Sequence, residues 1–139
     1  MSSTALYNTE VLALATSLAD YPLTSFLPLR GSARAATCGS TIGLGLAVDS
    51  TGRITSAGLH AQACAIGQAA AAIFAAAAPG KNRREIESSV TGIEQWLAGG
   101  ALPHWPGMTA IAAARDYPAR HGAILLAWRA ALVALAPPG

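Results

Sequence analysis

The first part of the chain carries apolar residues at the spacing of an amphipathic helix. Glu10 falls on the opposite side of this pattern. Four residues form the apolar face: Leu6, Val11, Leu14 and Leu18. The pattern predicts a helix over residues 4–18, with Thr4 as its N-cap. An Asp-Tyr-Pro sequence at 20–22 ends this helix, because the residue before proline avoids helical dihedral angles. We expect residues 22–36 to be irregular.

Apolar and small residues then alternate over residues 41–49. Alternation of this kind is typical of a strand with one buried face. The apolar positions are Ile42, Leu44, Leu46 and Val48. The Asp-Ser-Thr-Gly sequence at 49–52 is a turn signal, so residues 53–62 are predicted to form the partner strand of a hairpin. In a regular strand, one face would hold Ile54, Ser56, Gly58, His60 and Gln62.

A helix is predicted directly after this hairpin. Residues 64–78 are nearly all alanine, which is a strong helix former. Pro79-Gly80 ends the segment. Asn82 and Glu85 then form a capping-box pattern at the start of a second helix, which runs to the glycine pair at 99–100.

The C-terminal part of the chain contains further helical segments. We predict a loop over residues 102–107, a short helix over 108–115 and a final helix that begins near Pro118, a residue suited to the first turn. This order of elements predicts one α+β domain over residues 1–139, with helices packed on one face of a small antiparallel sheet.

The composition restricts the class of protein. Of 139 residues, 53% are hydrophobic and 12% are charged, which excludes an intrinsically disordered chain. The net charge is +2 and the nine basic residues are scattered, so we expect no nucleic-acid partner. Mean hydropathy is +0.40, but the two most apolar stretches are too rich in alanine or too short for a membrane span, so we expect no membrane partner. No secretory signal is evident, and a cytoplasmic protein with reduced thiols is expected.

The two cysteines are the main candidates for chemistry. Cys38 precedes the first predicted strand and Cys64 follows the second, so the hairpin brings both to one end of the sheet. Cys64 also lies where a helix begins, and the positive end of a helix stabilises a thiolate. This arrangement predicts a metal site or a redox pair. The alternative interpretation is two buried cysteines that act as small apolar side chains.

Four segments, in this order and spacing, carry a resemblance to a known family. They are Leu6-Tyr7-Asn8, Cys38-Gly39 before the alternating strand, Gln-Ala-Cys-Ala-Ile-Gly-Gln-Ala-Ala at 62–70, and Tyr-Pro-Ala-Arg-His-Gly-Ala-Ile-Leu-Leu-Ala-Trp at 117–128. Over nearly its whole length the chain resembles the IscU/NifU-type iron–sulfur cluster assembly scaffolds. The resemblance implies a three-stranded antiparallel sheet with helices on one side.

The same resemblance implies a function and a set of ligands. Members of the family hold a nascent cluster with three cysteines and a nearby aspartate, and receive sulfur from a cysteine desulfurase. Cys38 and Cys64 match the first two cysteines, whereas Ser40 stands at the aspartate position and Ala123 at the third cysteine. The implied cargo is a [2Fe–2S] cluster, iron or zinc. The implied partners are a cysteine desulfurase and other iron–sulfur assembly factors.

This chain therefore has fewer candidate metal ligands than the family pattern implies. A two-iron cluster commonly takes four thiolates, and zinc takes four ligands. Ser40 and His121 are the further candidate metal ligands. Serine is a poor substitute for a carboxylate. His121 is shifted along the chain from the expected ligand position, and on a helix a shift of one residue turns a side chain by about 100°. Two copies of the chain, each giving two thiolates, would also supply four, so a homo-oligomer is a further hypothesis.

Three functions stay open from the sequence. The leading hypothesis is a scaffold-like protein that binds iron, a cluster or zinc through Cys38 and Cys64. The second is a non-enzymatic module that kept the scaffold fold, lost cluster assembly and binds or regulates an assembly factor. The third is a thiol redox protein, which would need the two cysteine Cα atoms within about 7 Å. No constellation for hydrolysis, hydride transfer or phosphoryl transfer is evident, so we do not expect an enzyme.

Overall fold

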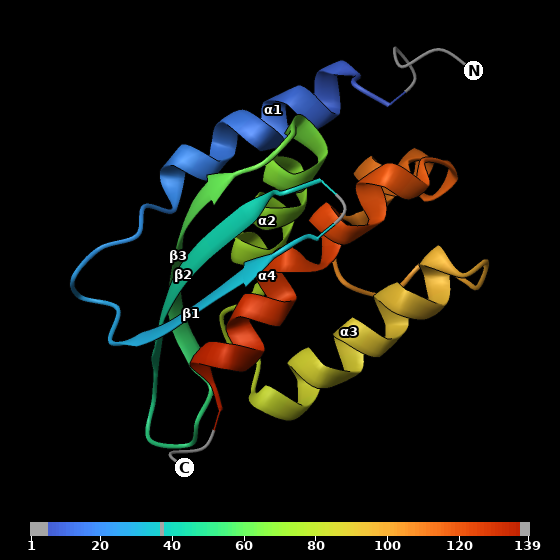
Figure 1. Ribbon diagram of the computed structural model, residues 1–139. Helices are drawn as coiled ribbons and strands as arrows, with labels where there is room; N and C mark the ends of the chain where they lie inside the picture. The colour runs from blue at the N-terminus through green and yellow to red at the C-terminus, as the bar shows by residue number, and fades with distance from the viewer. Residues whose placement is uncertain (1–5, 37, 137–139) are drawn as a thin grey trace.

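The computed structural model describes residues 6–36 and 38–136. Its helices and strands follow one another along the chain as Figure 1 shows. In chain order they are α1 (Thr9–Ser17), η2 (Leu18–Asp20), β1 (Leu29–Arg34), β2 (Thr41–Val48), β3 (Ile54–Gln62), α2 (Ala65–Ala77), α3 (Arg83–Leu97), η3 (Met108–Asp116), η4 (Pro118–Arg120) and α4 (His121–Ala134).

The sheet has three antiparallel strands in the order β1-β2-β3. Leu44 pairs with Gly31 on one side and with Leu59 on the other. The α+β class and the three-stranded sheet are as expected. The prediction of irregular structure over 22–36 is wrong for the part that forms β1. Exposed and half-buried residues alternate strictly along this strand, but only Leu29 is large and apolar, so the pattern in the sequence is faint.

A bulge changes the face to which Ile54 belongs. The register of β2 and β3 shifts between Ala47 and Val48, so that Ala47 pairs with Ser56 while Val48 pairs with Ile54. The extra residue, Thr55, moves Ile54 from the face of Ser56 to the buried face, where Ile54 is 2% exposed. Simple alternation over the strand is therefore wrong at its first residue, because a β-bulge places two residues opposite one.

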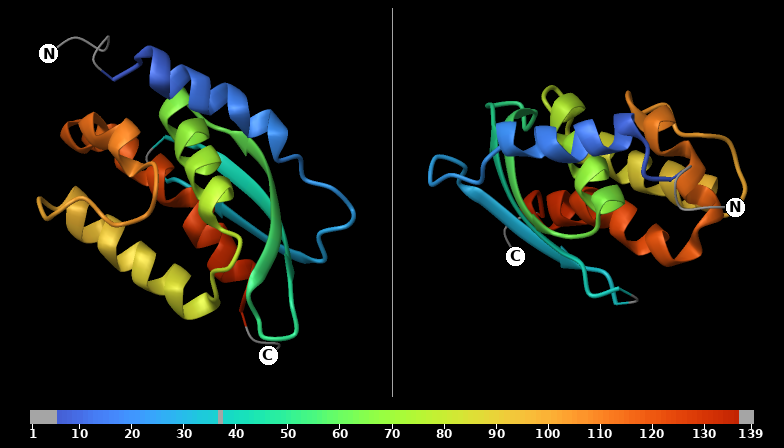
Figure 2. Two further views of the ribbon diagram at one scale, coloured as in Figure 1. Left: turned by 180° about the vertical axis from the view of Figure 1, so that it is seen from behind. Right: turned by 90° about the horizontal axis from the view of Figure 1, so that it is seen from above.

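The helices lie on one side of the sheet. Helices α2 and α4 pack on the strands, α1 lies along α2, and α3 packs against α4 (Figures 1 and 2). The core between them contains Phe74, Trp105 and Trp128, with ring centroids 5.3–5.6 Å apart. The Trp105 indole donates a hydrogen bond of 2.9 Å to the Ile73 carbonyl, which fixes the loop before η3 to α2. Among the described residues, no helix combines the length and apolar character that a bilayer crossing requires.

Polar caps decide where two of the helices begin. Asn8 accepts a 2.9 Å hydrogen bond from the Val11 backbone, so α1 begins at Thr9 and not at the start of the predicted helix. The predicted cap, Thr4, lies outside the described residues. Asn82 and Glu85 form the expected capping box at the start of α3. The short helix expected after the loop is a 3-10 helix, η3.

The face of the sheet away from the helices is partly covered by residues 22–28, here called the covering segment. Glycines on this face let the segment lie directly on the strands: a Cβ at Gly58 would lie 2.1 Å from the Pro22 carbonyl oxygen, and one at Gly45 would lie 2.8 Å from the Leu27 Cβ. Arg30 holds the segment in place, because its guanidinium donates to the carbonyls of Thr24 and Leu27.

Candidate functional site

Cys38 and Cys64 line one hollow at the end of the sheet. The hollow has a volume of about 300 Å³ and is completed by Gly39, Ser40, Gln62, Ala63 and Arg120. Cys38 is exposed, Cys64 is partly buried, and both thiols are free. The expectation that the hairpin brings the two cysteines to one end of the sheet is therefore confirmed. The interpretation of both as buried apolar side chains is wrong for Cys38.

The connection between β1 and β2 presents Cys38 to this hollow. The Ser40 carbonyl accepts a 2.9 Å hydrogen bond from the Ala35 N–H, and the Ala35 carbonyl accepts one of 2.8 Å from the Gly39 N–H. These two bonds close a tight turn with Cys38 near its tip. Gly39 has a φ of 73°, a conformation that residues with a side chain rarely adopt. The glycine after Cys38 thus allows the chain to reverse directly behind the thiol.

The surroundings of Cys38 favour its thiolate form. Its Sγ lies 3.1 Å from the Ser40 Oγ. Hydrogen bonding from the Ser40 side chain, and next from the Ser40 backbone, lowers the pKa of the Cys38 thiol below its ordinary value. The positive charge of Arg120 acts in the same direction, while partial burial opposes both effects. Ser40 itself is 7% exposed, so its hydroxyl is held at a fixed place beside the sulfur.

Cys64 occupies the N-cap position of α2. Its backbone is extended, with φ −65° and ψ 170°, and among the described residues its side chain makes no capping hydrogen bond. The unpaired N–H groups at a helix start carry a partial positive charge. The Cys64 side chain therefore lies at the positive end of α2 and is not engaged in holding the helix end.

Arg120 contributes the positive charge of the hollow. It is the last residue of η4, and its guanidinium carbon lies 5.9 Å from the centre of the Tyr7 ring. From the sequence, Arg120 was equally compatible with pairing to Asp116, with capping carbonyls or with binding an anion. Its place beside the cysteines depends on the tertiary packing that brings η4 to the hollow. The only signal in the sequence is its position inside the segment 117–128 of the resemblance.

The position expected for a third cysteine is adjacent to the hollow but carries no ligand. Ala123 is 1% exposed, and a Cβ built at Gly67 in the first turn of α2 would lie 3.2 Å from the Ala123 Cβ. This contact puts residue 123 one turn from Cys64. In the described parts of the chain, no group of three or more His, Cys, Asp and Glu side chains is arranged to hold a metal ion.

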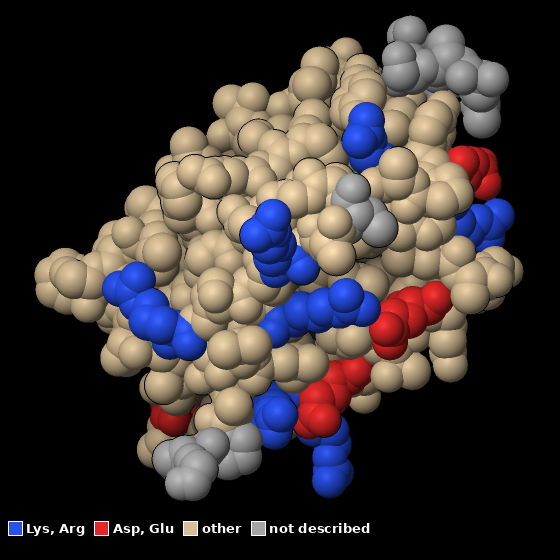
Figure 3. Space-filling view, in the orientation of Figure 1, with Lys and Arg blue, Asp and Glu red and all other residues tan. Residues whose placement is uncertain are grey.

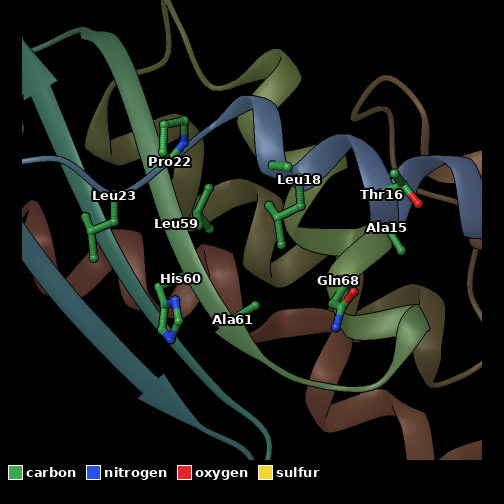
Figure 4. Close-up of a pocket in the computed structure, with 10 residues that line it drawn as sticks. Ala15, Thr16, Leu18, Pro22, Leu23, Leu59, His60, Ala61 and Gln68 are labelled. Atoms are coloured by element: carbon green, nitrogen blue, oxygen red, sulfur yellow. The ribbon is translucent and has the colours of Figure 1, made fainter.

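No histidine is among the residues that line the cysteine hollow. The Nε2 atom of His121 is 2.7 Å from the Arg115 carbonyl oxygen, so this ring nitrogen is engaged away from the hollow. His60 is exposed on the outer face of β3 and borders a different hollow of about 630 Å³ between α1 and β3 (Figure 4). Neither cysteine lines that hollow. His104 is exposed near the loop that precedes η3.

Charged side chains form no single block on the face shown in Figure 3, where Lys and Arg are separated by uncharged surface and by Asp and Glu. Two ion pairs join elements of the described chain, Arg53 with Glu85 at 2.9 Å and Arg129 with Glu94 at 3.2 Å. The Arg120 charge at the cysteine hollow is therefore a local feature.

Comparison with known proteins finds the same fold in solved structures. No protein-family model matches the sequence, and no curated protein matches it. A crystal structure of a nitrogen-fixing NifU-like protein (N-terminal part) from Brucella abortus is similar with a TM-score of 0.83 and 25% identity, over 93% of this chain and 91% of that chain. A structure from Fervidobacterium islandicum AW-1, described as an iron–sulfur cluster assembly scaffold for the SUF system, has a TM-score of 0.83 and 19% identity, over 96% and 99%.

The likeness spans nearly the entire chain. Two of the three cysteine positions implied by the sequence motifs are occupied, and the third holds Ala123. The chain therefore has the fold of the NifU-like and SUF-type iron–sulfur cluster assembly scaffolds, to which it is similar over nearly its whole length.

Proposed function

We propose that this chain is a scaffold-like protein of iron–sulfur cluster assembly, which holds iron, a nascent cluster or zinc through the thiolates of Cys38 and Cys64. It would act as one domain, without a catalytic role of its own, and would work in the cytoplasm with a cysteine desulfurase. The observation that carries the proposal is the shared hollow, in which two thiols from different elements meet one buried hydroxyl and one guanidinium.

The chemistry of the hollow supports metal binding. Soft thiolates prefer iron and zinc over harder cations. The surroundings of Cys38 favour its deprotonation, through Ser40 and Arg120. Cys64 stands at the start of α2, where its side chain makes no capping hydrogen bond. Because metal binding requires the thiolate, the surroundings of Cys38 lower the cost of releasing its proton.

The other two candidate ligands would contribute less. The Ser40 hydroxyl already lies beside Cys38, where it supports the thiolate, and a neutral hydroxyl is a weaker ligand than a carboxylate. His121 would have to leave the Arg115 carbonyl before its Nε2 could bind a metal. We therefore assign the cysteines as ligands and Ser40 as the residue that tunes Cys38.

A second candidate function is a partner-binding module that no longer assembles clusters. Two features favour it: an apolar, buried residue stands at position 123, and the described residues contain no complete set of metal ligands. Such a module would keep the surface that assembly partners recognise without carrying iron or sulfide.

Purification without air distinguishes the two functions. The scaffold hypothesis predicts bound iron or zinc in the isolated protein, or a visible absorption after reconstitution with ferrous iron and sulfide, and loss of both in the Cys64→Ala variant. Protein that stays colourless and free of metal, yet binds a purified cysteine desulfurase with the same affinity as the Cys64→Ala variant, would support the module.

A further inference from the structure

A groove lies between α3 and the loop that precedes η3, and we call it the α3 groove. The loop turns back along the helix (Figure 1), and two adjoining hollows lie between residues 81–92 on one side and residues 103–106 on the other. The larger hollow has a volume of about 520 Å³ and the smaller one of about 240 Å³, and Ser88 and His104 border both. Of the described residues, none lines both this groove and the cysteine hollow, so the two sites are separate.

The larger hollow contains an ammonium group that is already held in place. The Lys81 Nζ atom lies 5.0 Å from the centre of the Trp105 ring and donates a 3.1 Å hydrogen bond to the Ala77 carbonyl. Trp105 is itself fixed, because it is 6% exposed and donates its hydrogen bond to the Ile73 carbonyl. An ammonium group carries three N–H donors, so two of them are left for a ligand.

Two further donors lie in the same hollow. Arg84 and Ser88 are one turn apart on α3, which places them on the same face of the helix. Both are exposed, and in the described parts of the chain no hydrogen bond or ion pair engages either side chain. Glu85 is the one carboxylate among the residues that line this hollow, and it is paired with Arg53 at 2.9 Å. Lys81 and Arg84 therefore give the larger hollow an excess of positive charge.

The smaller hollow has no charged side chain among the described residues that line it. Gly92, in the middle of α3, forms part of its wall, and a Cβ there would make an ordinary contact of 3.6 Å with the Pro103 Cβ. Neither packing nor a positive φ requires glycine at this position, and alanine is the better helix former. Gly92 thus keeps this end of the groove open at a cost to helix stability.

We propose that the α3 groove binds a small organic phosphate, with its phosphate group against Lys81, Arg84 and Ser88 and its organic part in the smaller hollow. A phosphate monoester carries nearly two negative charges at neutral pH and three strong acceptor oxygens, which match two cations and a hydroxyl. A carboxylate offers one charge and two oxygens, and inorganic phosphate has no organic part to fill the smaller hollow. This binding uses neither cysteine and goes beyond the proposed function.

Amide chemical shifts of the complete, reduced chain provide the test. The probes are AMP, ribose 5-phosphate and 3-phosphoglycerate, and inorganic phosphate and adenosine represent the charged part and the neutral part alone. We expect saturable shifts at residues 81–92 and 104–105, and tighter binding of at least one organic phosphate than of inorganic phosphate or adenosine.

Three outcomes would overturn the proposal. The first is the absence of saturable shifts with all three organic phosphates at millimolar concentration. The second is inorganic phosphate that binds as tightly as every organic phosphate. The third is a set of shifts confined to the turn around Cys38 and to Arg120, because the anion would then bind at the cysteine hollow.

Charge variants test the phosphate contacts. Arg84→Gln and Lys81→Met should each weaken the binding of the organic phosphate about tenfold, as expected for the loss of one hydrogen bond to a charged group. Arg34→Gln, which removes an exposed charge on β1 and lines neither hollow of the groove, is the matched control and should leave the affinity unchanged. Equal affinities of the three variants would contradict the assigned contacts.

Gly92→Ala tests the smaller hollow. This variant should unfold at a higher denaturant concentration, because alanine favours the helix. It should also bind the organic phosphate more weakly and inorganic phosphate as before, because the added methyl group reduces only the space for the organic part. A variant that is more stable and binds the organic phosphate as tightly as the natural chain would overturn the assignment of the smaller hollow.

Discussion

Replacing Ala123 with cysteine adds a third thiol beside the first turn of α2. Residue 123 lies in the first turn of α4 and is 1% exposed, and the close approach of Gly67 fixes its distance from the helix that Cys64 begins. A sulfur on the Cβ of residue 123 would therefore lie next to the existing hollow. We expect the Ala123→Cys variant to bind zinc more tightly than the natural chain.

The size of this gain follows from the energetics of zinc sites. Structural zinc sites with four ligands contribute about 10–16 kcal/mol near neutral pH, which is about 3 kcal/mol for each ligand. One further thiolate should therefore raise zinc affinity about a hundredfold. Burial of the new thiol makes its deprotonation harder and reduces the gain at lower pH. One extra buried atom should cost about 1–3 kcal/mol in the free energy of unfolding.

Competition with a chromophoric chelator measures the affinity, and denaturant unfolding of the metal-free protein measures the stability. Ala123→Ser is the matched control, because serine has nearly the same shape as cysteine and lacks the sulfur. The cysteine variant should also bind one zinc per chain, since three thiolates and a water complete a site within one copy. Equal zinc affinities of the Cys and Ser variants, with both folded, would refute the placement of residue 123 at the hollow.

Three further predictions concern the thiolate, the sheet and a helix start. Ser40→Ala should shift the pH midpoint of Cys38 alkylation in metal-free protein upward, toward the ordinary thiol value of about 8.5, because the hydrogen bond that lowers the pKa of Cys38 is lost. An unchanged midpoint would show that Ser40 does not lower this pKa. Gly58→Ala should lower the free energy of unfolding by about 1–3 kcal/mol. Gly43→Ala on the same face is the control and should be tolerated, because the nearest atom to a Cβ at that position lies 3.8 Å away. Similar losses of stability in the two variants would count against the close contact at Gly58. Asn82→Ala should cost about 1 kcal/mol by the same measurement, with Asn82→Asp as the control that retains the cap, and equal stability of the two variants would exclude a capping role.

The elements that the sequence predicts well are those with strong periodic signals. Alternation over β2, the alanine-rich composition of α2 and the Asn-x-x-Glu pattern at α3 each depend on local residues, and each element forms where it is expected. Strand β1 is different because its inward positions after Leu29 hold only glycine and alanine. Its burial comes from α4, which is far away in the chain and cannot be read from the strand itself.

The site divides in the same way. The meeting of Cys38 and Cys64 follows from a hairpin and a helix start that are continuous in the chain, so the sequence predicts it. Arg120 reaches the hollow only through the packing of η4 near Tyr7, a residue that is far from it in the chain. The hydrogen bond of His121 to Arg115 likewise depends on the path between η3 and α4. Contacts of this kind, between residues far apart in the chain, leave no periodic pattern in the sequence.

The contact between the covering segment and the glycines beneath it restricts which residues the sheet can carry at those positions. A side chain at Gly58 fits only if the backbone at Pro22 follows another path, so residue 58 must stay glycine for as long as the covering segment keeps this path. The fold therefore requires glycine at position 58 whether or not the cysteines are kept. Because no cargo ligand is involved, this structural signature would outlast the chemistry of the site.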